Sequence, residues 1–163
     1  MFLRASKFPG QALAGIALGS LAAVAAALAA QYGFGVKPCA WCVMQRGVFL
    51  LIALVAALGW LFNRQRPVRR MALMALILLG LAGLAAAYYQ HDVASKLASC
   101  DMTLADRINS ALNLEALLPS VFMVTASCSD AAQYRLLALP YEFWSGVLFL
   151  LVSGISWVAL TKR

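Results

Sequence analysis

The stretch PCAWCVMQRGVFLLIALVAALGWLF, residues 38–62, joins a Cys-x-x-Cys pair directly to a long apolar run. The pair is Cys39 and Cys42, and only Gln45 and Arg46 interrupt the run that follows. Roughly 20 apolar residues are enough to cross a bilayer as a helix. A Cys-x-x-Cys can be a redox disulfide or half of a metal site. The stretch therefore predicts a spanning helix with a redox-active or metal-binding pair at its start.

The composition extends this prediction to the whole chain. Of the 163 residues, 64% are hydrophobic and 12% are charged, whereas a soluble domain is about 45–50% apolar and about 25% charged. Apolar runs predict helices at 10–31, 43–62, 71–89 and 141–161. A cleaved signal peptide is the alternative for the first run, but an apolar signal region usually has only about 7–15 residues. We therefore expect an all-α integral membrane protein, a four-transmembrane-helix bundle forming a single domain over residues 1–163.

The basic residues predict the orientation of this bundle. The net charge is +7, but the basic residues flank the apolar runs in short clusters, which argues for membrane topology and against a nucleic-acid partner. Lys and Arg accumulate on the cytoplasmic side of membrane proteins. One set of ends carries basic residues and no acids: Arg4, Lys7, Arg64, Arg66, Arg69, Arg70, Lys162 and Arg163. Both termini are therefore predicted to be cytoplasmic, with outer loops at 32–42 and 90–140.

The second outer loop is long and has a substructure of its own. It contains Cys100, Cys128 and the only histidine, His91. Within it, residues 109–125 are rich in leucine but are too short and too interrupted by Pro119 to cross a bilayer. An apolar segment of this kind is typical of a short helix lying in the membrane interface.

The predicted topology puts all of the cysteines on the outer side. Disulfides persist in oxidising compartments such as the bacterial periplasm. A zinc site would need four converging ligands, usually as two close pairs, and Cys100 and Cys128 are far apart in the sequence. We therefore expect disulfides and no metal. A disulfide between Cys39 and Cys42 would close too small a loop to act as a useful staple, which favours an exchangeable redox bond.

The surroundings of Cys42 point to electron transfer at the lipid boundary. Cys42 stands at the predicted start of a helix, where the helix dipole favours a thiolate. Arg46 is one helical turn further on and adds a permanent positive charge on the same face. The alternative for Arg46 is an arginine whose head simply reaches the lipid headgroups. A membrane quinone fits as electron acceptor, although the spacing does not demand one.

The residues Pro-Cys-x-x-Cys-x-x-Gln-Arg at 38–46, the four-helix layout and the cysteine-bearing outer loop resemble the bacterial disulfide bond formation protein B (DsbB) family. Leu118-Pro119 and Leu139-Pro140 are similar to that family as well. The resemblance implies an inner-membrane protein-dithiol:quinone oxidoreductase. Such a protein re-oxidises a DsbA-like periplasmic thioredoxin-fold protein and passes the electrons to ubiquinone or menaquinone.

The same resemblance implies a role for each site residue. The redox-active disulfides would be Cys39–Cys42 and Cys100–Cys128, with the dithiol partner attacking Cys100, and Cys128 then attacking Cys39. Cys42 and Arg46 would contact the quinone. His91 is a candidate for the same site, and a solvated interfacial histidine is its alternative. Two other functions remain open at this point: a membrane scaffold with inert disulfides, and a membrane thiol reductase.

Overall fold

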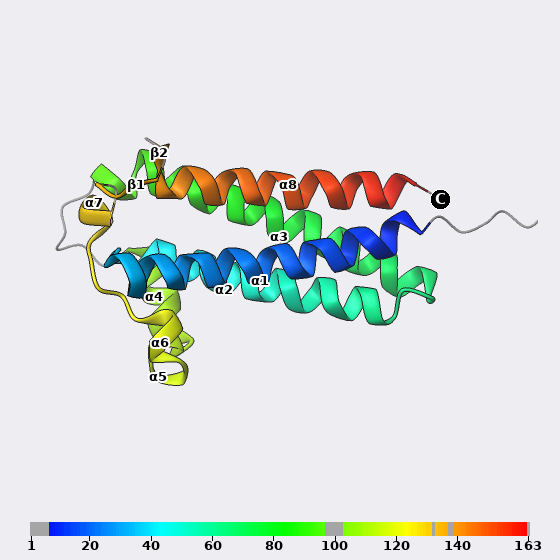
Figure 1. Cartoon of the computed structure of the whole chain (residues 1–163), viewed down its shortest axis with the longest axis horizontal. Coiled ribbons are helices and arrows are strands. Elements are labelled where there is room, and N and C mark those ends of the chain that lie inside the picture. Colours follow the sequence, from blue (N-terminus) through cyan, green and yellow to red (C-terminus); the bar gives the residue numbers. More distant parts are fainter. Residues whose placement is uncertain (1–6, 97–102, 132, 137–138, 163) are drawn as a thin grey trace, which may run out of the picture.

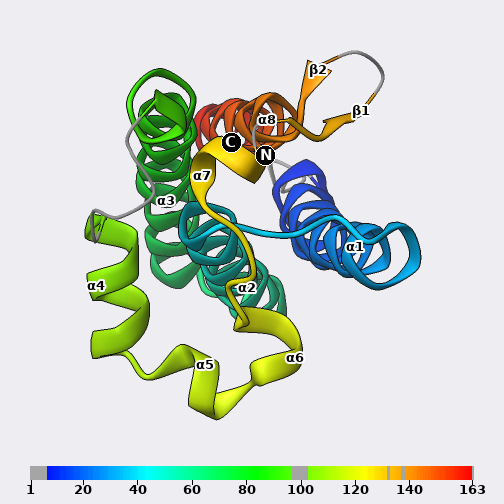
Figure 2. The same cartoon turned by 90° about the vertical axis from the view of Figure 1, so that its left-hand side faces the viewer.

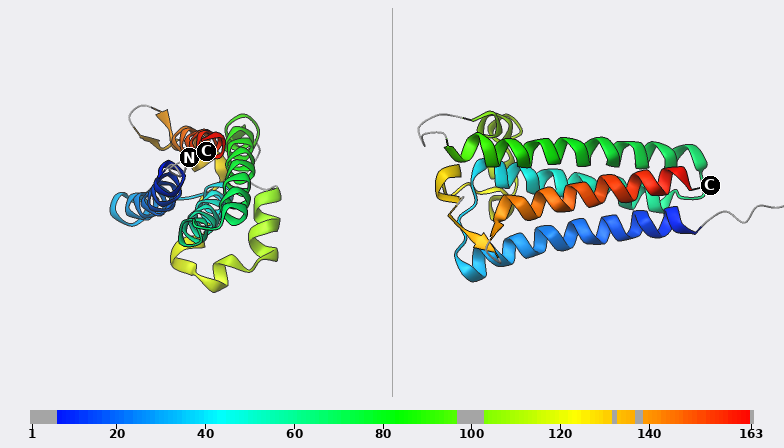
Figure 3. Two further views of the ribbon diagram at one scale, coloured as in Figure 1. Left: turned by 90° about the vertical axis from the view of Figure 1, so that its right-hand side faces the viewer. Right: turned by 90° about the horizontal axis from the view of Figure 1, so that it is seen from above.

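The computed structural model describes residues 7–96, 103–131, 133–136 and 139–162. Within these residues, four helices are long and apolar enough to cross a membrane, and they lie side by side along the long axis of the molecule (Figures 1 and 3). They are α1 (Phe8–Phe34), α2 (Ala40–Leu61), α3 (Arg66–Asp92) and α8 (Tyr141–Thr161). The predicted all-α, four-helix membrane fold is confirmed, and the chain is a multi-pass membrane protein.

Short elements lie together at one end of the bundle, which we call the loop end (Figure 1). The short turn between α2 and α3 lies at the opposite end. The elements between α3 and α8 are η1 (Ala94–Lys96), α4 (Leu104–Ala111), α5 (Leu114–Leu117), α6 (Pro119–Phe122), α7 (Cys128–Ala131), β1 (Arg135–Leu136) and β2 (Leu139–Pro140). The two strands pair antiparallel. Helices α4, α5 and α6 project sideways from the bundle (Figures 1 and 2).

The single short helix predicted within residues 109–125 is replaced by α5, α6 and the end of α4. Two local features divide the segment. Asn113 adopts a left-handed backbone, φ 51°, between α4 and α5. Pro119 begins α6 and has no backbone N–H to continue the preceding helix. The apolar side chains in this segment include Leu117 and Leu118, which are exposed, as they would be on a surface that meets lipid.

Three of the four long helices extend beyond the predicted apolar runs at one or both ends, because helical hydrogen bonding continues into residues that an apolar window leaves out. The fourth, α8, begins and ends at the predicted residues, 141 and 161. α1 covers 8–34 instead of 10–31 and ends at Gly35, whose φ of 67° suits a glycine C-cap. α3 covers 66–92 instead of 71–89, and Pro67 fits its first turn. α2 begins at Ala40 instead of 43, so Cys42 lies within its first turn.

The core is formed where α2 packs between α1 and α3, and where α3 packs against α8. The rings of Phe49 on α2 and Phe149 on α8 stack with their centroids 4.2 Å apart. Gly80 and Gly83 on α3 let α8 approach closely, because a Cβ at either position would collide with Ser153 or Phe149. α1 and α8 touch much less, so an apolar groove remains between them.

Candidate functional site

The Cys-x-x-Cys pair lies at the start of α2. Cys39 is the N-cap residue, with an extended backbone, and its side chain is fully buried at 0% exposure. Cys42 is half-buried, and its sulfur lies 3.2 Å from that of Cys39. Both are free thiols in this structure, so it describes the reduced pair. The disulfide between them stays a prediction.

A third sulfur, that of Cys128, lies next to Cys39. The backbone N–H groups of Thr125 and Ala126 donate to the carbonyl of Pro38, at 3.0 and 3.3 Å. These bonds hold the segment ahead of α7 against the start of α2. Cys128, at the first position of α7, hydrogen-bonds to Cys39. Two segments far apart in the sequence therefore bring three sulfurs together.

The hydrogen bond between Cys39 and Cys128 shifts the pKa values of the two thiols in opposite directions. The Cys39 thiol donates, and this bond lowers the pKa of Cys128. The same bond raises the pKa of Cys39, with further contributions from the hydrogen bond to Cys42 and from burial. In this reduced site, Cys128 therefore ionises more readily than Cys39.

Helix α4 supports this cluster from the side. Its N-terminus is closed by a capping box between Thr103 and Asp106. The amide of Asn109 donates to the carbonyl of Ala40 at 3.1 Å, which ties α4 to the first turn of α2. Cys100 lies outside the described residues, so the predicted Cys100–Cys128 disulfide stays a prediction.

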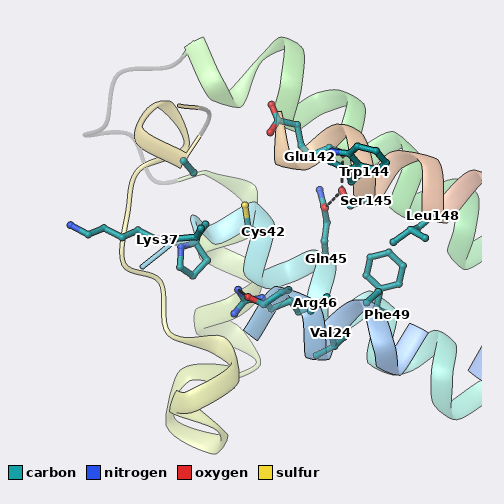
Figure 4. Close-up of a pocket in the computed structure, with 16 residues that line it drawn as sticks. Val24, Lys37, Cys42, Gln45, Arg46, Phe49, Glu142, Trp144, Ser145 and Leu148 are labelled. Carbon is teal, nitrogen blue, oxygen red and sulfur yellow. Dashed lines mark hydrogen bonds between the residues drawn. The ribbon is translucent and has the colours of Figure 1, made fainter. Parts of the chain in front are cut away.

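A pocket begins at Cys42 and runs between α1, α2 and α8 (Figure 4). Its walls are mainly apolar, with Val24, Phe49 and Leu148 among the side chains that line it. Its polar groups lie mostly towards the loop end: Lys37, Cys42, Gln45, Arg46, Glu142 and Ser145. An apolar pocket with a few convergent polar groups is the usual form of a site for a small organic molecule.

Arg46 lines this pocket one helical turn beyond Cys42, and its side chain is 6% exposed. Its guanidinium donates to Gln31 Oε1 at 2.6 Å, to the carbonyl of Val121 at 3.0 Å and to that of Ala27 at 3.5 Å. These acceptors belong to α1 and α6. Arg46 therefore carries a buried positive charge and also ties the outer loop to the bundle.

His91 lies at the edge of the site. Its side chain is 59% exposed, and its Nδ1 is 3.1 Å from a carboxylate oxygen of Glu142, which is 3% exposed. Glu142 lines the pocket, whereas His91 is not among the described residues that do so. The structure thus connects His91 to the pocket through Glu142.

Several polar residues of this region, buried or half-buried, were not proposed as site residues from the sequence. They are Gln31, Gln90, Glu142 and Ser145, together with Gln45, which was noted only as part of the motif at 38–46. The available signal was their position, because each lies within or at the end of an apolar run, where polar side chains are costly and often functional. Within the described ranges, no three His, Cys, Asp or Glu side chains form a group that could hold a metal ion.

Comparison with known proteins agrees with this arrangement. The model of the family "Disulfide bond formation protein DsbB" matches residues 9–159. A "Disulfide bond formation protein B" of Cupriavidus metallidurans is 32% identical over 149 residues, which cover 91% of this chain and 90% of that protein. One of Polaromonas naphthalenivorans is 28% identical over 169 residues, covering 100% and 97%. With the pocket and its sulfurs in place, the match shows that this chain belongs to the DsbB family of disulfide-forming oxidoreductases.

Proposed function

We propose that this protein oxidises a DsbA-like dithiol protein of thioredoxin fold and passes the electron pair to a membrane quinone. Family membership establishes disulfide bond formation as its role. The observation that carries the finer proposal is the position of Cys42. Its sulfur contacts the buried Cys39 on one side and lines an apolar pocket on the other. It therefore joins thiol chemistry to a site for an apolar molecule.

Electron transfer begins with thiol–disulfide exchange. A thiolate of the dithiol partner attacks Cys100 of the Cys100–Cys128 disulfide and forms a mixed disulfide, and Cys128 leaves with the electron pair of the broken bond. The Cys128 thiolate then attacks Cys39. A Cys39–Cys128 bond forms, the Cys39–Cys42 bond breaks, and its electron pair stays on Cys42. The contact between Cys128 and Cys39 supports this order, because it puts the attacking sulfur beside the sulfur that it attacks.

The remaining steps release the partner and restore the chain. The second thiolate of the partner attacks the mixed disulfide, which forms the partner's own disulfide and frees Cys100. Cys100 attacks Cys128, re-forms Cys100–Cys128 and frees Cys39. Oxidation of Cys39 and Cys42 to a disulfide then releases two electrons and two protons. A quinone in the pocket accepts the two electrons and the two protons and leaves as the quinol.

The lining of the pocket and of the groove beside it supports a quinone as the electron acceptor. Arg46 supplies N–H donors and a positive charge beside Cys42, where negative charge develops. The adjoining groove between α1 and α8 shares Ala23, Phe49 and Leu148 with the pocket and is mainly apolar. It would accept an isoprenoid chain open to lipid. Ubiquinone and menaquinone both have this form.

The charge distribution supports an orientation for these steps. The described cysteines, Cys39, Cys42 and Cys128, lie at the loop end. The turn between α2 and α3 and the first turns of α3, at the opposite end, carry four arginines: Arg64, Arg66, Arg69 and Arg70. We therefore propose an inner-membrane protein with both termini cytoplasmic and the cysteines periplasmic. The dithiol partner would then meet the site from the periplasm, and the quinone would enter from the bilayer.

The direct test uses the purified protein in detergent with a reduced thioredoxin-fold dithiol protein and ubiquinone. We expect one quinol for each disulfide formed in the partner, with no oxidation when quinone is left out. Menaquinone in a parallel reaction reports the preferred quinone. Disulfides that stay inert, or electron flow from quinol to the partner's disulfide, would contradict the proposal and favour a scaffold or a reductase.

A substitution at Arg46 tests the quinone site within this assay. Arg46→Ala should raise the apparent KM for ubiquinone by roughly tenfold or more, since it removes a charged hydrogen-bond donor from the pocket. The KM for the dithiol protein should change far less. Arg64→Ala removes an exposed arginine in the turn at the opposite end and is the matched control. A larger change in the KM for the dithiol protein than for quinone would place Arg46 in partner binding instead.

A further inference from the structure

A row of polar side chains, the half-buried Ser145 and the buried Gln45 and Gln90, crosses the bundle and ends on the two sulfurs. Ser145 Oγ on α8 lies 2.6 Å from Gln45 Oε1 on α2, and Gln45 Nε2 donates to Gln90 Oε1 on α3 at 2.9 Å. Gln90 Nε2 then lies 3.3 Å from the sulfur of Cys42 and 3.7 Å from that of Cys39. Gln45 is 4% exposed and Gln90 is 3% exposed. Buried amides are costly unless they are hydrogen-bonded, and this row satisfies both.

The row has a direction. An amide carries its acceptor oxygen and its donor nitrogen on opposite sides, so fixing one fixes the other. The Ser145 hydroxyl has one proton and two acceptors within reach, Gln45 Oε1 at 2.6 Å and the Glu142 carbonyl at 2.8 Å. When it donates to Gln45, as in Figure 4, Gln45 must turn its N–H to Gln90. Gln90 is then left with a donor aimed at Cys42.

The groups around the Cys42 sulfur otherwise carry both signs of charge. They are Arg46 on α2, Lys37 and Glu142 on the pocket wall, the thiols of Cys39 and Cys128, Asp106 of α4 acting on Cys128, and His91 paired with Glu142. Cys39 also contacts the Cys42 sulfur directly, at 3.2 Å, but it is the other member of the reacting pair. The amide of Gln90, on α3, is a donor in direct contact that takes no part in the exchange itself. A donor bound to a charged sulfur forms a stronger bond than one bound to a neutral sulfur.

We propose that Gln90 is a catalytic hydrogen-bond donor to the Cys42 sulfur, held in its donating orientation by Gln45 and Ser145 as positioning residues. The proposal rests on the proposed function, and it names the group that favours the exchange between Cys128 and the Cys39–Cys42 disulfide. When the Cys128 thiolate bonds to Cys39, the Cys39–Cys42 bond breaks and its electron pair goes to Cys42. A thiol that is stabilised as the anion leaves faster. Gln90 thereby selects Cys42 as the leaving group and holds it as the thiolate that faces the pocket.

The test measures the reactivity of Cys42 in the full-length reduced protein, without quinone or dithiol partner. The probe is N-ethylmaleimide, with the modified cysteine identified by peptide mass spectrometry. Gln90→Met keeps the length of the side chain and removes the donor. We expect Cys42 to be alkylated about tenfold more slowly at neutral pH. At a pH high enough to ionise the thiols of both proteins, the two rates should converge, which separates ionisation from access.

Variants of Ser145 test the positioning role. Ser145→Ala should slow alkylation of Cys42, but by less than Gln90→Met does. Ser145→Thr keeps the hydroxyl and should give the rate of the parent protein. Gln11→Leu replaces an exposed glutamine near the start of α1, far from the loop end, and should leave the rate unchanged. A purely structural role for the row would slow alkylation equally at all pH values and would not be rescued by threonine.

The outcomes separate this proposal from the function on which it rests. Unchanged alkylation in Gln90→Met, with quinone-dependent oxidation of the partner intact in the parent protein, would overturn the role of Gln90 alone. If Gln90→Met has lost its helical circular dichroism signal, the alkylation rates of Ser145→Ala and Ser145→Thr decide the proposal instead. Slower alkylation in a protein that fails to reduce quinone would uphold the amide row and overturn the proposed function.

Discussion

At the scale of single residues, Cys39 is the hub of the site. It is fully buried, it lies 3.2 Å from the sulfur of Cys42, and it hydrogen-bonds to Cys128. The pKa of Cys39 is raised and that of Cys128 is lowered by the same bond. Disulfide exchange needs a thiolate as attacking group. In the reduced site Cys128 therefore ionises more readily than Cys39, and the contact between the two sulfurs agrees with the exchange step that we propose.

Two substitutions at Cys39 test the cause of the lowered Cys128 pKa. Cys39→Ser keeps a hydrogen-bond donor, whereas Cys39→Ala removes it. Because the pKa of Cys128 is lowered, its reactive thiolate is present above that pKa and is lost as the pH falls through it. The rate of Cys128 alkylation should rise with pH around the same midpoint in the serine variant as in the parent protein. In the alanine variant, this midpoint should move to higher pH. Identical profiles in the two variants would show that the hydrogen bond from Cys39 is not the cause.

At the scale of elements, the packing of α3 against α8 determines the geometry of the site. Gln90 lies near the end of α3 and Ser145 near the start of α8. Both must reach Gln45 on α2, so the distance between α3 and α8 has to be short. Gly80 and Gly83 make this possible, since any side chain there would meet Phe149 or Ser153. The small residues of α3 thus support chemistry at the far end of the same helix.

Adding a single methyl group to this contact should destabilise the bundle. A Cβ at Gly80 would collide with Ser153 Oγ and would lie 3.0 Å from the backbone oxygen of Phe149, which cannot move without shifting α8. We expect Gly80→Ala to cost about 1–3 kcal/mol, seen as a lower midpoint of thermal unfolding in detergent. Gly154→Ala, on α8 with nothing within 4 Å of the new atom, is the control. Equal midpoints for the two variants would mean that α3 and α8 are not closely packed at Gly80.

At the scale of the whole molecule, two chemically different ends are held apart by the length of the bundle. The described cysteines and helices α4 to α7 gather at the loop end, and the turn between α2 and α3, with the arginine-rich start of α3, lies at the opposite end (Figure 1). In a bilayer, this separation would put the dithiol exchange and the quinone reduction that we propose at the same face. The proposed function therefore requires the proposed orientation, with the loop end on the periplasmic side.

Labelling of introduced cysteines tests the orientation. In a variant whose own cysteines are replaced by serine, Gln133→Cys puts a thiol at the loop end and Gln65→Cys puts one in the turn between α2 and α3, both at exposed positions. A maleimide that cannot cross the inner membrane should label position 133 in intact cells whose outer membrane has been opened. Position 65 should be labelled only after lysis. The reverse pattern would invert the topology.

The number of spanning helices and their approximate positions could be predicted because both depend on local properties. An apolar run long enough for a bilayer forms a helix wherever its neighbours lie. Both ends of α8 were predicted correctly, but the ends of the other three helices were missed by one to five residues, most at Arg66, because polar residues join a helix without any apolar signal. The motif at 38–46 also identified the family, since its cysteines, glutamine and arginine are adjacent in sequence.

The sequence by itself thus determined a membrane bundle of this family with reactive cysteines at its edge. Only the tertiary structure decided what touches those cysteines. Gln45 and Gln90 are 45 positions apart, and Gln45 and Ser145 are 100 apart. These helices are apolar on nearly every side, so no periodic pattern fixes their rotation about their axes. Close packing of small residues and buried hydrogen bonds set that rotation, and both depend on residues from different helices meeting in space.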